Sequence, residues 1–137
     1  MGLKPTIYFD ACIAIYLVEE HPIYCAPIEE ALSAKAGIVC YSPLVVLESL
    51  VLPIQKQRDD LIRKFRIFFA ANQRLAMPDE VFELAANYRA KHRLKTPDAL
   101  HLAAARYHGC AELWTNDDRL NGAAGATAVN VLAGVRS

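Results

Sequence analysis

Three carboxylates stand apart from the other acidic residues because most of their neighbours along the chain are apolar: Asp10, Glu48 and Asp98. Glu48 is the one charged residue in the run Leu44–Leu52, so a buried helix there would have to desolvate it, which costs free energy unless a partner compensates. Carboxylates in such surroundings are candidate ligands of divalent cations. The structural alternative is that Glu48 lies on the one solvated side of its helix.

Asp10 and Asp117 each follow a short run of β-branched or aromatic residues, and the carboxyl ends of strands are where open α/β sheets bind ligands. Asp98 lies in the first turn of a predicted helix. Each of the three also has a structural alternative, because an aspartate can cap a helix or complement its dipole. If the sheet is parallel, Asp10 and Asp117 share one edge. Glu48 and Asp98 can reach that edge.

Clustered carboxylates raise one another's pKa values unless a divalent cation neutralises them, and oxygen-only ligands suit Mg²⁺ or Mn²⁺. One or two such ions can activate water and stabilise the charge that develops when a phosphodiester bond is cleaved. The four carboxylates are therefore candidates for a metal site that performs this chemistry.

The elements that must position these carboxylates alternate along the chain. β-branched and aromatic runs predict strands at residues 6–9, 38–41, 112–115 and 128–132. Apolar periodicity predicts helices at residues 11–20, 28–36, 44–55, 58–72, 79–93 and 96–108, followed by a turn and a loop over 119–125. This order predicts an α/β domain with a small, mainly parallel sheet flanked by helices.

The predicted ends of three helices carry recognisable capping residues. Ser42-Pro43 and Thr96-Pro97 each supply a hydroxyl for the N-cap and a proline for the first turn. Gly37 is the predicted left-handed C-cap of the helix before it.

Composition predicts one folded domain over residues 1–137, since 54% of the residues are hydrophobic and 22% are charged. The N-terminus lacks the apolar segment of a signal peptide, and no apolar stretch approaches the 18 or more residues of a membrane span. We therefore expect a cytoplasmic protein with no membrane partner. Four scattered cysteines, none in a C-x-x-C pair, are expected to be free, buried thiols.

Four blocks of this sequence resemble the signature blocks of PIN-domain nucleases in type, order and spacing. They are Ile7–Asp10, the helical Glu48, Thr96–Ala103 and Leu113–Leu120. The small size and the absence of an accessory domain resemble the VapC toxins of type II toxin-antitoxin modules, over residues 6–132. The resemblance implies a single PIN-like domain with a three-layer α/β/α fold, acting as a ribonuclease that depends on Mg²⁺ or Mn²⁺.

The resemblance also implies roles for individual residues. Asp10 and Asp98 would be the principal metal ligands. Glu48 would be a ligand or would orient the attacking water, and Asp117 would serve a second site or an outer shell. The residues that would support the site are Thr115 and Asn116.

Two positions leave the match to the family open. Ala11 stands where many relatives carry a hydroxyl residue, so a hydrogen bond near the metal is missing, and Ser42 is the expected substitute. Asp118 is adjacent to Asp117 and can stand in for it. We favour Asp117 because it lies two residues after Thr115, as in the family's block.

An acidic site repels RNA, so nearby cations must hold the substrate backbone. Residues 56–95 carry ten basic and five acidic residues in a chain whose formal net charge is zero. The cations expected to bind RNA precede Asp98 and are Arg89, Lys91, Arg93 and Lys95. The structural alternative is that they form the solvated face of an amphipathic helix. The four histidines show no metal-ligand spacing, and His101 is expected to pack within its helix.

The segments 11–18 and 44–54 are almost wholly apolar, which predicts that one face of them meets a second chain. The resemblance to VapC toxins implies a homodimer, a cognate antitoxin whose C-terminal segment lies near the site, and inhibition of translation through RNA cleavage.

Two other classes of protein compete with the nuclease. A phosphoaspartate phosphatase or receiver-like domain also places an aspartate after its first strand. Such phosphatases need a second aspartate two residues later, where this chain has Cys12, and no well-placed lysine follows near the last strand. A catalytically silent PIN-like module that binds RNA or protein is the second competitor. Four retained carboxylates argue against it, whereas Ala11 keeps it open.

Overall fold

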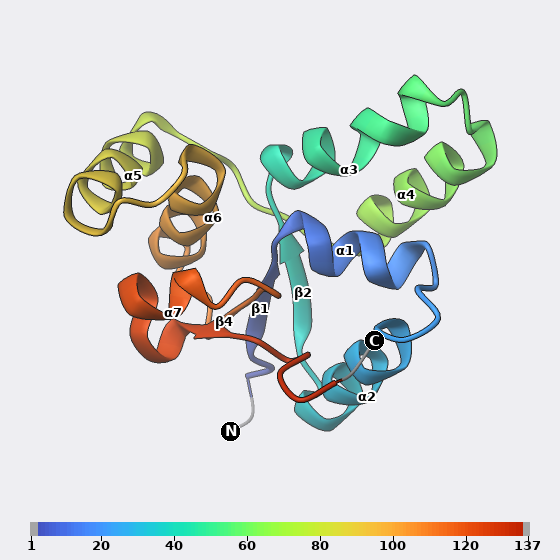
Figure 1. Ribbon diagram of the computed structural model, residues 1–137, viewed down its shortest axis with the longest axis horizontal. Helices are drawn as coiled ribbons and strands as arrows, with labels where there is room; N and C mark the ends of the chain where they lie inside the picture. The colour runs from blue at the N-terminus through green and yellow to red at the C-terminus, as the bar shows by residue number, and fades with distance from the viewer. Residues whose placement is uncertain (1–2, 136–137) are drawn as a thin grey trace.

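Five parallel strands form the central sheet of the computed structural model, which describes residues 3–135 (Figure 1). The strand order across the sheet is β3-β2-β1-β4-β5. The strands are β1 (Thr6–Phe9), β2 (Ile38–Tyr41), β3 (Gln73–Arg74), β4 (Glu112–Trp114) and β5 (Ala128–Val129). The predicted parallel sheet is confirmed. The prediction missed the two-residue β3, and it made β5 three residues too long.

Seven α-helices surround the sheet within the described residues. They are α1 (Ala11–Val18), α2 (Cys25–Lys35), α3 (Pro43–Gln55), α4 (Asp59–Ala71), α5 (Asp79–His92), α6 (Thr96–Tyr107) and α7 (Arg119–Ala124). The first six confirm predicted helices, although α2 begins three residues earlier than expected. The segment predicted as a turn and a loop instead forms α7 and a 3₁₀ turn at Gly125–Thr127.

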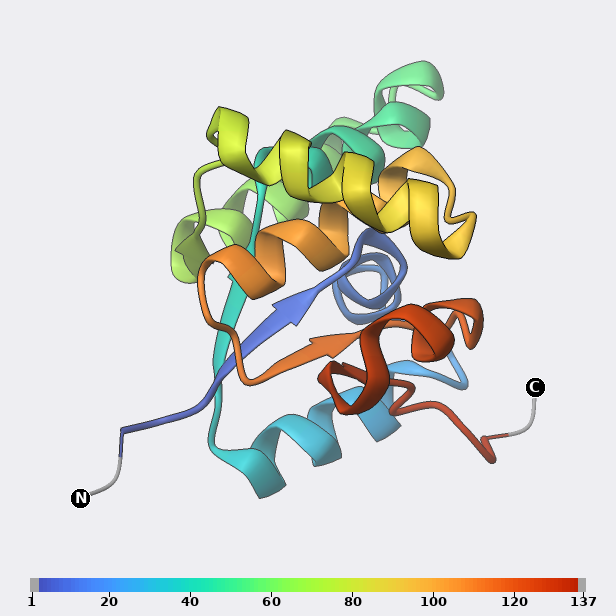
Figure 2. The same ribbon diagram turned by 90° about the vertical axis from the view of Figure 1, so that its left-hand side faces the viewer.

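The helices lie on both faces of the sheet, which gives the predicted three-layer α/β/α arrangement. Helices α5, α6 and α7 lie on one side, and α1, α2 and α4 lie on the other (Figure 1). Seen from the left, α5 lies over α6, and α7 lies beside the strands (Figure 2). Helix α3 starts where β2 ends and packs on α1 and α4.

The central strand β1 is buried on both faces, as expected of a parallel strand between two layers of helices. Ile7, Tyr8 and Phe9 have no exposed surface. The ring of Phe9 stacks on that of Trp114 in β4, with 5.7 Å between centroids. Tight packing around β1 therefore fixes the residue that follows it, Asp10.

Three predicted helix ends differ in the structure. Ala36, with φ of 50°, is the left-handed C-cap of α2 in place of Gly37. Gly37 is needed for another reason, because a Cβ there would collide with the side chain of Ile7. Lys95, not Thr96, occupies the N-cap position of α6. Ser42 does occupy the N-cap of α3, but its hydroxyl makes no capping bond and pairs with Tyr8 instead.

The four cysteines are free, as predicted, but Cys40 alone among them is buried. The other three are partly exposed. Over residues 3–135, no helix combines the length and the apolar character that crossing a membrane requires.

Candidate active site

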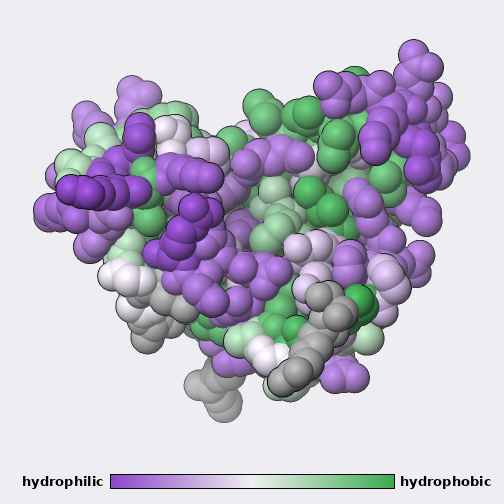
Figure 3. All heavy atoms as spheres, viewed as in Figure 1, coloured by the Kyte–Doolittle hydropathy of each residue, from purple (hydrophilic) through white to green (hydrophobic). Residues whose placement is uncertain are grey.

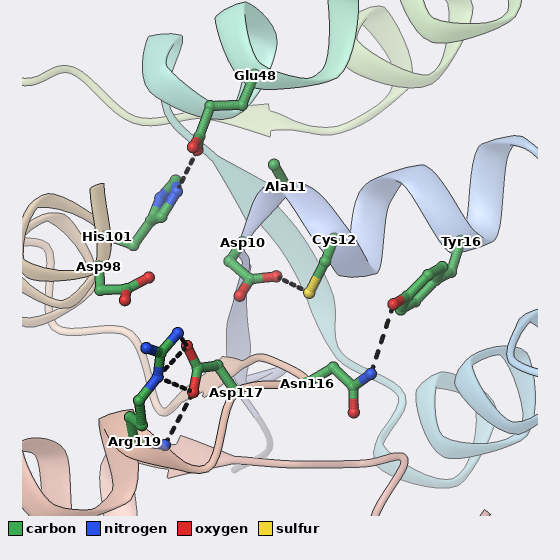
Figure 4. Close-up of a pocket in the computed structure, with 10 residues that line it drawn as sticks. All are labelled: Asp10, Ala11, Cys12, Tyr16, Glu48, Asp98, His101, Asn116, Asp117 and Arg119. Carbon is green, nitrogen blue, oxygen red and sulfur yellow. Dashed lines mark hydrogen bonds and ion pairs between the residues drawn. The ribbon is translucent and has the colours of Figure 1, made fainter. Parts of the chain in front are cut away.

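A cavity of about 500 Å³ lies at the carboxyl ends of β1 and β4, and all four predicted carboxylates line it (Figure 4). The residues around it are Asp10, Ala11, Cys12, Tyr16, Glu48, Asp98, His101, Asn116, Asp117 and Arg119. The carboxylates come from the end of β1, from α3, from the first turn of α6 and from the loop after β4. Only the fold brings these carboxylates together, since Asp10 and Asp117 lie 107 positions apart along the chain.

Asp10 both caps α1 and lines the cavity. It directly follows β1, is 8% exposed, and accepts a hydrogen bond from the Ile13 backbone N–H through Oδ1 at 3.2 Å. The Cys12 thiol donates to the same oxygen at 2.9 Å. Burial and the Asp10 charge raise the pKa of Cys12, so the thiol keeps its proton and remains a donor. The capping alternative is therefore also correct, and it fixes the carboxylate in place.

Asp98 carries the clearest sign that negative charges crowd this cavity. Burial raises its pKa, and the nearby charges of Asp117 and Asp10 raise it further. His101 and Arg119 act in the opposite direction. The net direction is upward, so the carboxylate lies where its charge is poorly compensated.

Asp117 is held by the residue two positions later. Arg119 donates to Oδ1 at 3.0 Å through Nε and to Oδ2 at 2.8 Å through its terminal nitrogen. Hydrogen bonding from the Arg119 side chain lowers the pKa of Asp117. Thr115 is fully buried and accepts from the Asp117 backbone N–H at 3.0 Å. Asp118 instead accepts from Asn130 at 3.0 Å and does not line the cavity.

Glu48 is partnered by a histidine that the sequence analysis assigned to helix packing. His101 is 3% exposed, and its Nε2 lies 2.6 Å from Glu48 Oε1. The expectation that His101 merely packs within its helix is therefore wrong. One signal pointed to it: residues three apart share a helix face, and His101 follows Asp98 by three. Figure 4 shows both side chains directed from α6 toward the cavity.

The remaining supporting residues differ in their contacts with the cavity. Asn116 lines it and donates to the Tyr16 hydroxyl at 3.4 Å. Ala11, where the family resemblance implied a hydroxyl, lines it without a polar group. Ser42 does not line it, so it cannot replace that hydroxyl directly.

The donor set has the right chemistry for a hard cation, because Mg²⁺ and Mn²⁺ prefer carboxylate oxygens. Within residues 3–135, however, no three His, Cys, Asp or Glu side chains stand close enough together to share one ion. Arg119 and His101 each hold one carboxylate in the present arrangement. Shared coordination therefore requires side-chain movement, and the exposed Asp117–Arg119 pair is the easier of the two to break.

A second, smaller cavity of about 350 Å³ adjoins the first and shares Asp98 and Arg119 with it. Its other lining residues are His92, Arg93, Leu94 and Lys95. Two of the four predicted RNA-binding cations therefore line a cavity beside the carboxylates. Lys91 does not line it, and Arg89 donates to the Leu94 carbonyl at 2.9 Å.

The sequence profile of the PIN domain family matches residues 7–126. The chain belongs to this family. The match includes all four carboxylates and the strands that position Asp10 and Asp117. No curated protein matches this PIN domain in sequence.

Solved structures share the fold of this PIN domain at low sequence identity. A toxin–antitoxin complex from Klebsiella pneumoniae is 22% identical with a TM-score of 0.76, over 91% of this chain and 97% of that one. VapBC2 from Rickettsia felis, bound to a promoter DNA fragment, is 17% identical with a TM-score of 0.74, over 91% and 98%. VapC20 from Mycobacterium tuberculosis, described as a sarcin–ricin loop cleaving toxin, is 17% identical with a TM-score of 0.67, over 85% and 94%.

Four residues of the cavity were not predicted as site residues: Cys12, Tyr16, His101 and Arg119. Arg119 stands two residues after Asp117, and Cys12 stands two residues after Asp10. Proximity in sequence to a candidate carboxylate was thus the available signal for these two. Tyr16 reaches the cavity through the placement of α1, for which the sequence carries no comparable signal.

Proposed function

We propose that this PIN domain is a ribonuclease that depends on Mg²⁺ or Mn²⁺ and hydrolyses RNA phosphodiester bonds. The observation that carries the proposal is that four carboxylates from four separate segments line one cavity. Membership of the PIN family and the fold shared with a toxin that cleaves the sarcin–ricin loop support it.

Each carboxylate has a role that its surroundings allow. Asp10 and Asp98 would hold the cation, because one is anchored at the end of β1 and the other has a poorly compensated charge. Asp117 would join them on release from Arg119, with Thr115 and Asn116 supporting its loop. Glu48 would be a further ligand of the cation or would orient the attacking water. A bound cation would supply Lewis-acid stabilisation of the charge that develops on the phosphate.

The RNA backbone would approach through the second cavity. Arg93 and Lys95 there offer positive charge beside Asp98, and phosphate contacts of this kind provide affinity without reading sequence. Lys91 and Arg89 do not line this cavity and would contribute only to the positive electrostatic potential around it.

We further propose that the protein is a cytoplasmic toxin of a VapBC-type module, forms a homodimer and is inhibited by a cognate antitoxin. The similarity to a toxin–antitoxin complex supports the antitoxin. Helix α3 supports the homodimer, because it leaves four large apolar side chains exposed (Figure 3): Leu47, Val51, Leu52 and Ile54. Helix α1, which was expected to share that role, has no large exposed apolar side chain.

The test is cleavage of end-labelled total RNA and transfer RNA by the purified protein, with Mn²⁺, with Mg²⁺ and with EDTA. We expect discrete fragments only with a divalent cation. Asp98→Asn should lower the rate by about 100-fold or more, because it removes a carboxylate that would hold the cation, and the cation stabilises the charge developing on the phosphate. Sedimentation of the same preparation reports the oligomeric state.

Asp118→Asn is the matched control, since it makes the same chemical change outside the cavity and should cut at the wild-type rate. Cleavage that survives EDTA or Asp98→Asn would contradict the proposal. A folded protein that binds Mn²⁺ but cuts no RNA would favour the silent RNA- or protein-binding module.

A further inference from the structure

A buried chain of hydrogen bonds runs from the N-cap residue of α3 through β1 to the cavity. Ser42 Oγ lies 2.7 Å from the Tyr8 hydroxyl, and that hydroxyl lies 2.8 Å from His101 Nδ1. The other ring nitrogen, Nε2, lies 2.6 Å from Glu48 Oε1. Ser42 and Tyr8 have no exposed surface, whereas the Glu48 side chain is 29% exposed. The chain therefore begins in the core and ends at the wall of the active site.

The direction of these hydrogen bonds follows from the groups themselves. An ionised Glu48 only accepts, so His101 Nε2 must carry a hydrogen and donate it. In the neutral ring Nδ1 is then an acceptor, and the Tyr8 hydroxyl donates to it. The Ser42 hydroxyl in turn donates to Tyr8. Glu48 therefore selects the ring tautomer that presents Nε2–H to it, and the Tyr8 hydroxyl complements that tautomer by donating to Nδ1.

We propose that His101 is a positioning residue of the active site, which fixes the Glu48 carboxylate through this chain. This inference rests on the proposed function. With Oε1 committed to His101, Glu48 is left with Oε2 to bind the cation or to accept a hydrogen bond from the attacking water. A glutamate with three rotatable side-chain torsions and partial exposure would otherwise occupy several orientations.

The same histidine also relates two carboxylates to each other. His101 and Asp98 lie three residues apart on α6, so they share a face of one rigid helix. Glu48 lies on α3, and the bond to His101 links that helix to α6. His101 thereby fixes the position of Glu48 relative to Asp98.

Two amide substitutions separate this role from simple packing. His101→Gln carries an amide nitrogen near the position of Nε2 and keeps a donor for Glu48, whereas His101→Asn is shorter and loses it. We expect His101→Asn to lower kcat on bulk transfer RNA by about 10- to 100-fold and to weaken Mn²⁺ binding, with KM unchanged. His101→Gln should retain most of the wild-type kcat and most of the wild-type Mn²⁺ affinity. Mn²⁺ affinity is read from the electron paramagnetic resonance of the free ion.

His108→Asn is the matched control, because His108 caps the same helix and bonds the Ala76 carbonyl at 2.7 Å, away from the cavity. It should leave kcat and Mn²⁺ affinity unchanged. Equal losses in His101→Asn and His101→Gln, accompanied by equal falls in Tm, would reduce His101 to a packing residue and overturn the inference. Wild-type behaviour of His101→Asn would also overturn it.

The two proposals fail separately. If the wild-type protein cuts no RNA, the proposed function fails, and the Mn²⁺ titration alone decides the role of His101. Weaker binding in His101→Asn, restored in His101→Gln, would still support positioning of Glu48. Equal Mn²⁺ affinity in all three proteins would overturn it.

Discussion

The two walls of the candidate active site hold their carboxylates in opposite ways. On one wall, Glu48 is bonded to His101, which is joined through Tyr8 to Ser42 in the core. On the other wall, Asp117 is paired with Arg119, whose side chain is 66% exposed. Both pairs are short, at 2.6 Å and 2.8 Å, and the two carboxylates are about equally exposed, but the partner His101 is buried whereas the partner Arg119 is not.

This difference shows that a short distance alone does not make a contact rigid. A buried hydrogen-bond network is costly to disrupt, because each partner left behind is desolvated and unpaired. An exposed ion pair exchanges readily with water and salt. The Glu48 wall is therefore pre-organised, whereas Asp117 is able to leave Arg119 for another cation. Asp98 lies between the two walls and has its pKa raised, while that of Asp117 is lowered.

The largest effect on stability should come from removing one hydroxyl in the buried wall. Tyr8→Phe leaves Ser42 Oγ and His101 Nδ1 without their partner and should lower the free energy of unfolding by about 1–3 kcal/mol. Tyr16→Phe is the matched change on the cavity's exposed side, where the bond to Asn116 is 3.4 Å long. It should cost at most about 0.5 kcal/mol. Urea unfolding of both variants at pH 7 measures the contrast, and equal losses would contradict it.

A smaller effect of opposite sign should follow from Asp98→Asn. Because the folded protein raises the pKa of Asp98, it binds the proton more tightly than the unfolded chain does. Stability is therefore lost as the pH rises from the ordinary aspartate range through the raised pKa. Above that window the variant should melt at most a few degrees higher than the wild type, and below it the difference should vanish. Melting curves across the acid range test this, and saturating Mg²⁺ should reduce the difference by stabilising the ionised wild type.

The smallest effect should come from Arg119→Gln in the exposed wall. Loss of this pair should leave the free energy of unfolding at pH 7 within the error of a urea titration. The pKa of Asp117 should return upward, because Arg119 is the main cause of its lowering. The lowered pKa gives stability that is present above the ordinary range and lost as the pH falls, and the variant should lack that dependence. A change as large as that of Tyr8→Phe would show that both walls are equally rigid.

Local sequence was sufficient to predict most of the fold. Alternating apolar runs located four of the five strands and the first six helices, since β1 and α6 carry strong periodic signals. The prediction failed where the run of residues was short or where tertiary contacts determined the secondary structure. The two residues of β3 are too few to form a pattern, and the helical state of 119–124 depends on packing beside the sheet.

The same division applies to the candidate site. Apolar surroundings were enough to select Asp10, Glu48 and Asp98, because charged groups in apolar segments need a compensating role. Asp117 was selected by its place after a predicted strand and by the family resemblance. The partners of these carboxylates were decided by the tertiary structure alone. His101 lies 53 residues from Glu48 and 93 from Tyr8, and no local pattern encodes contacts at such separation. The sequence thus determined which carboxylates are candidates for the chemistry, whereas packing of α3, α6 and β1 determined how each is held.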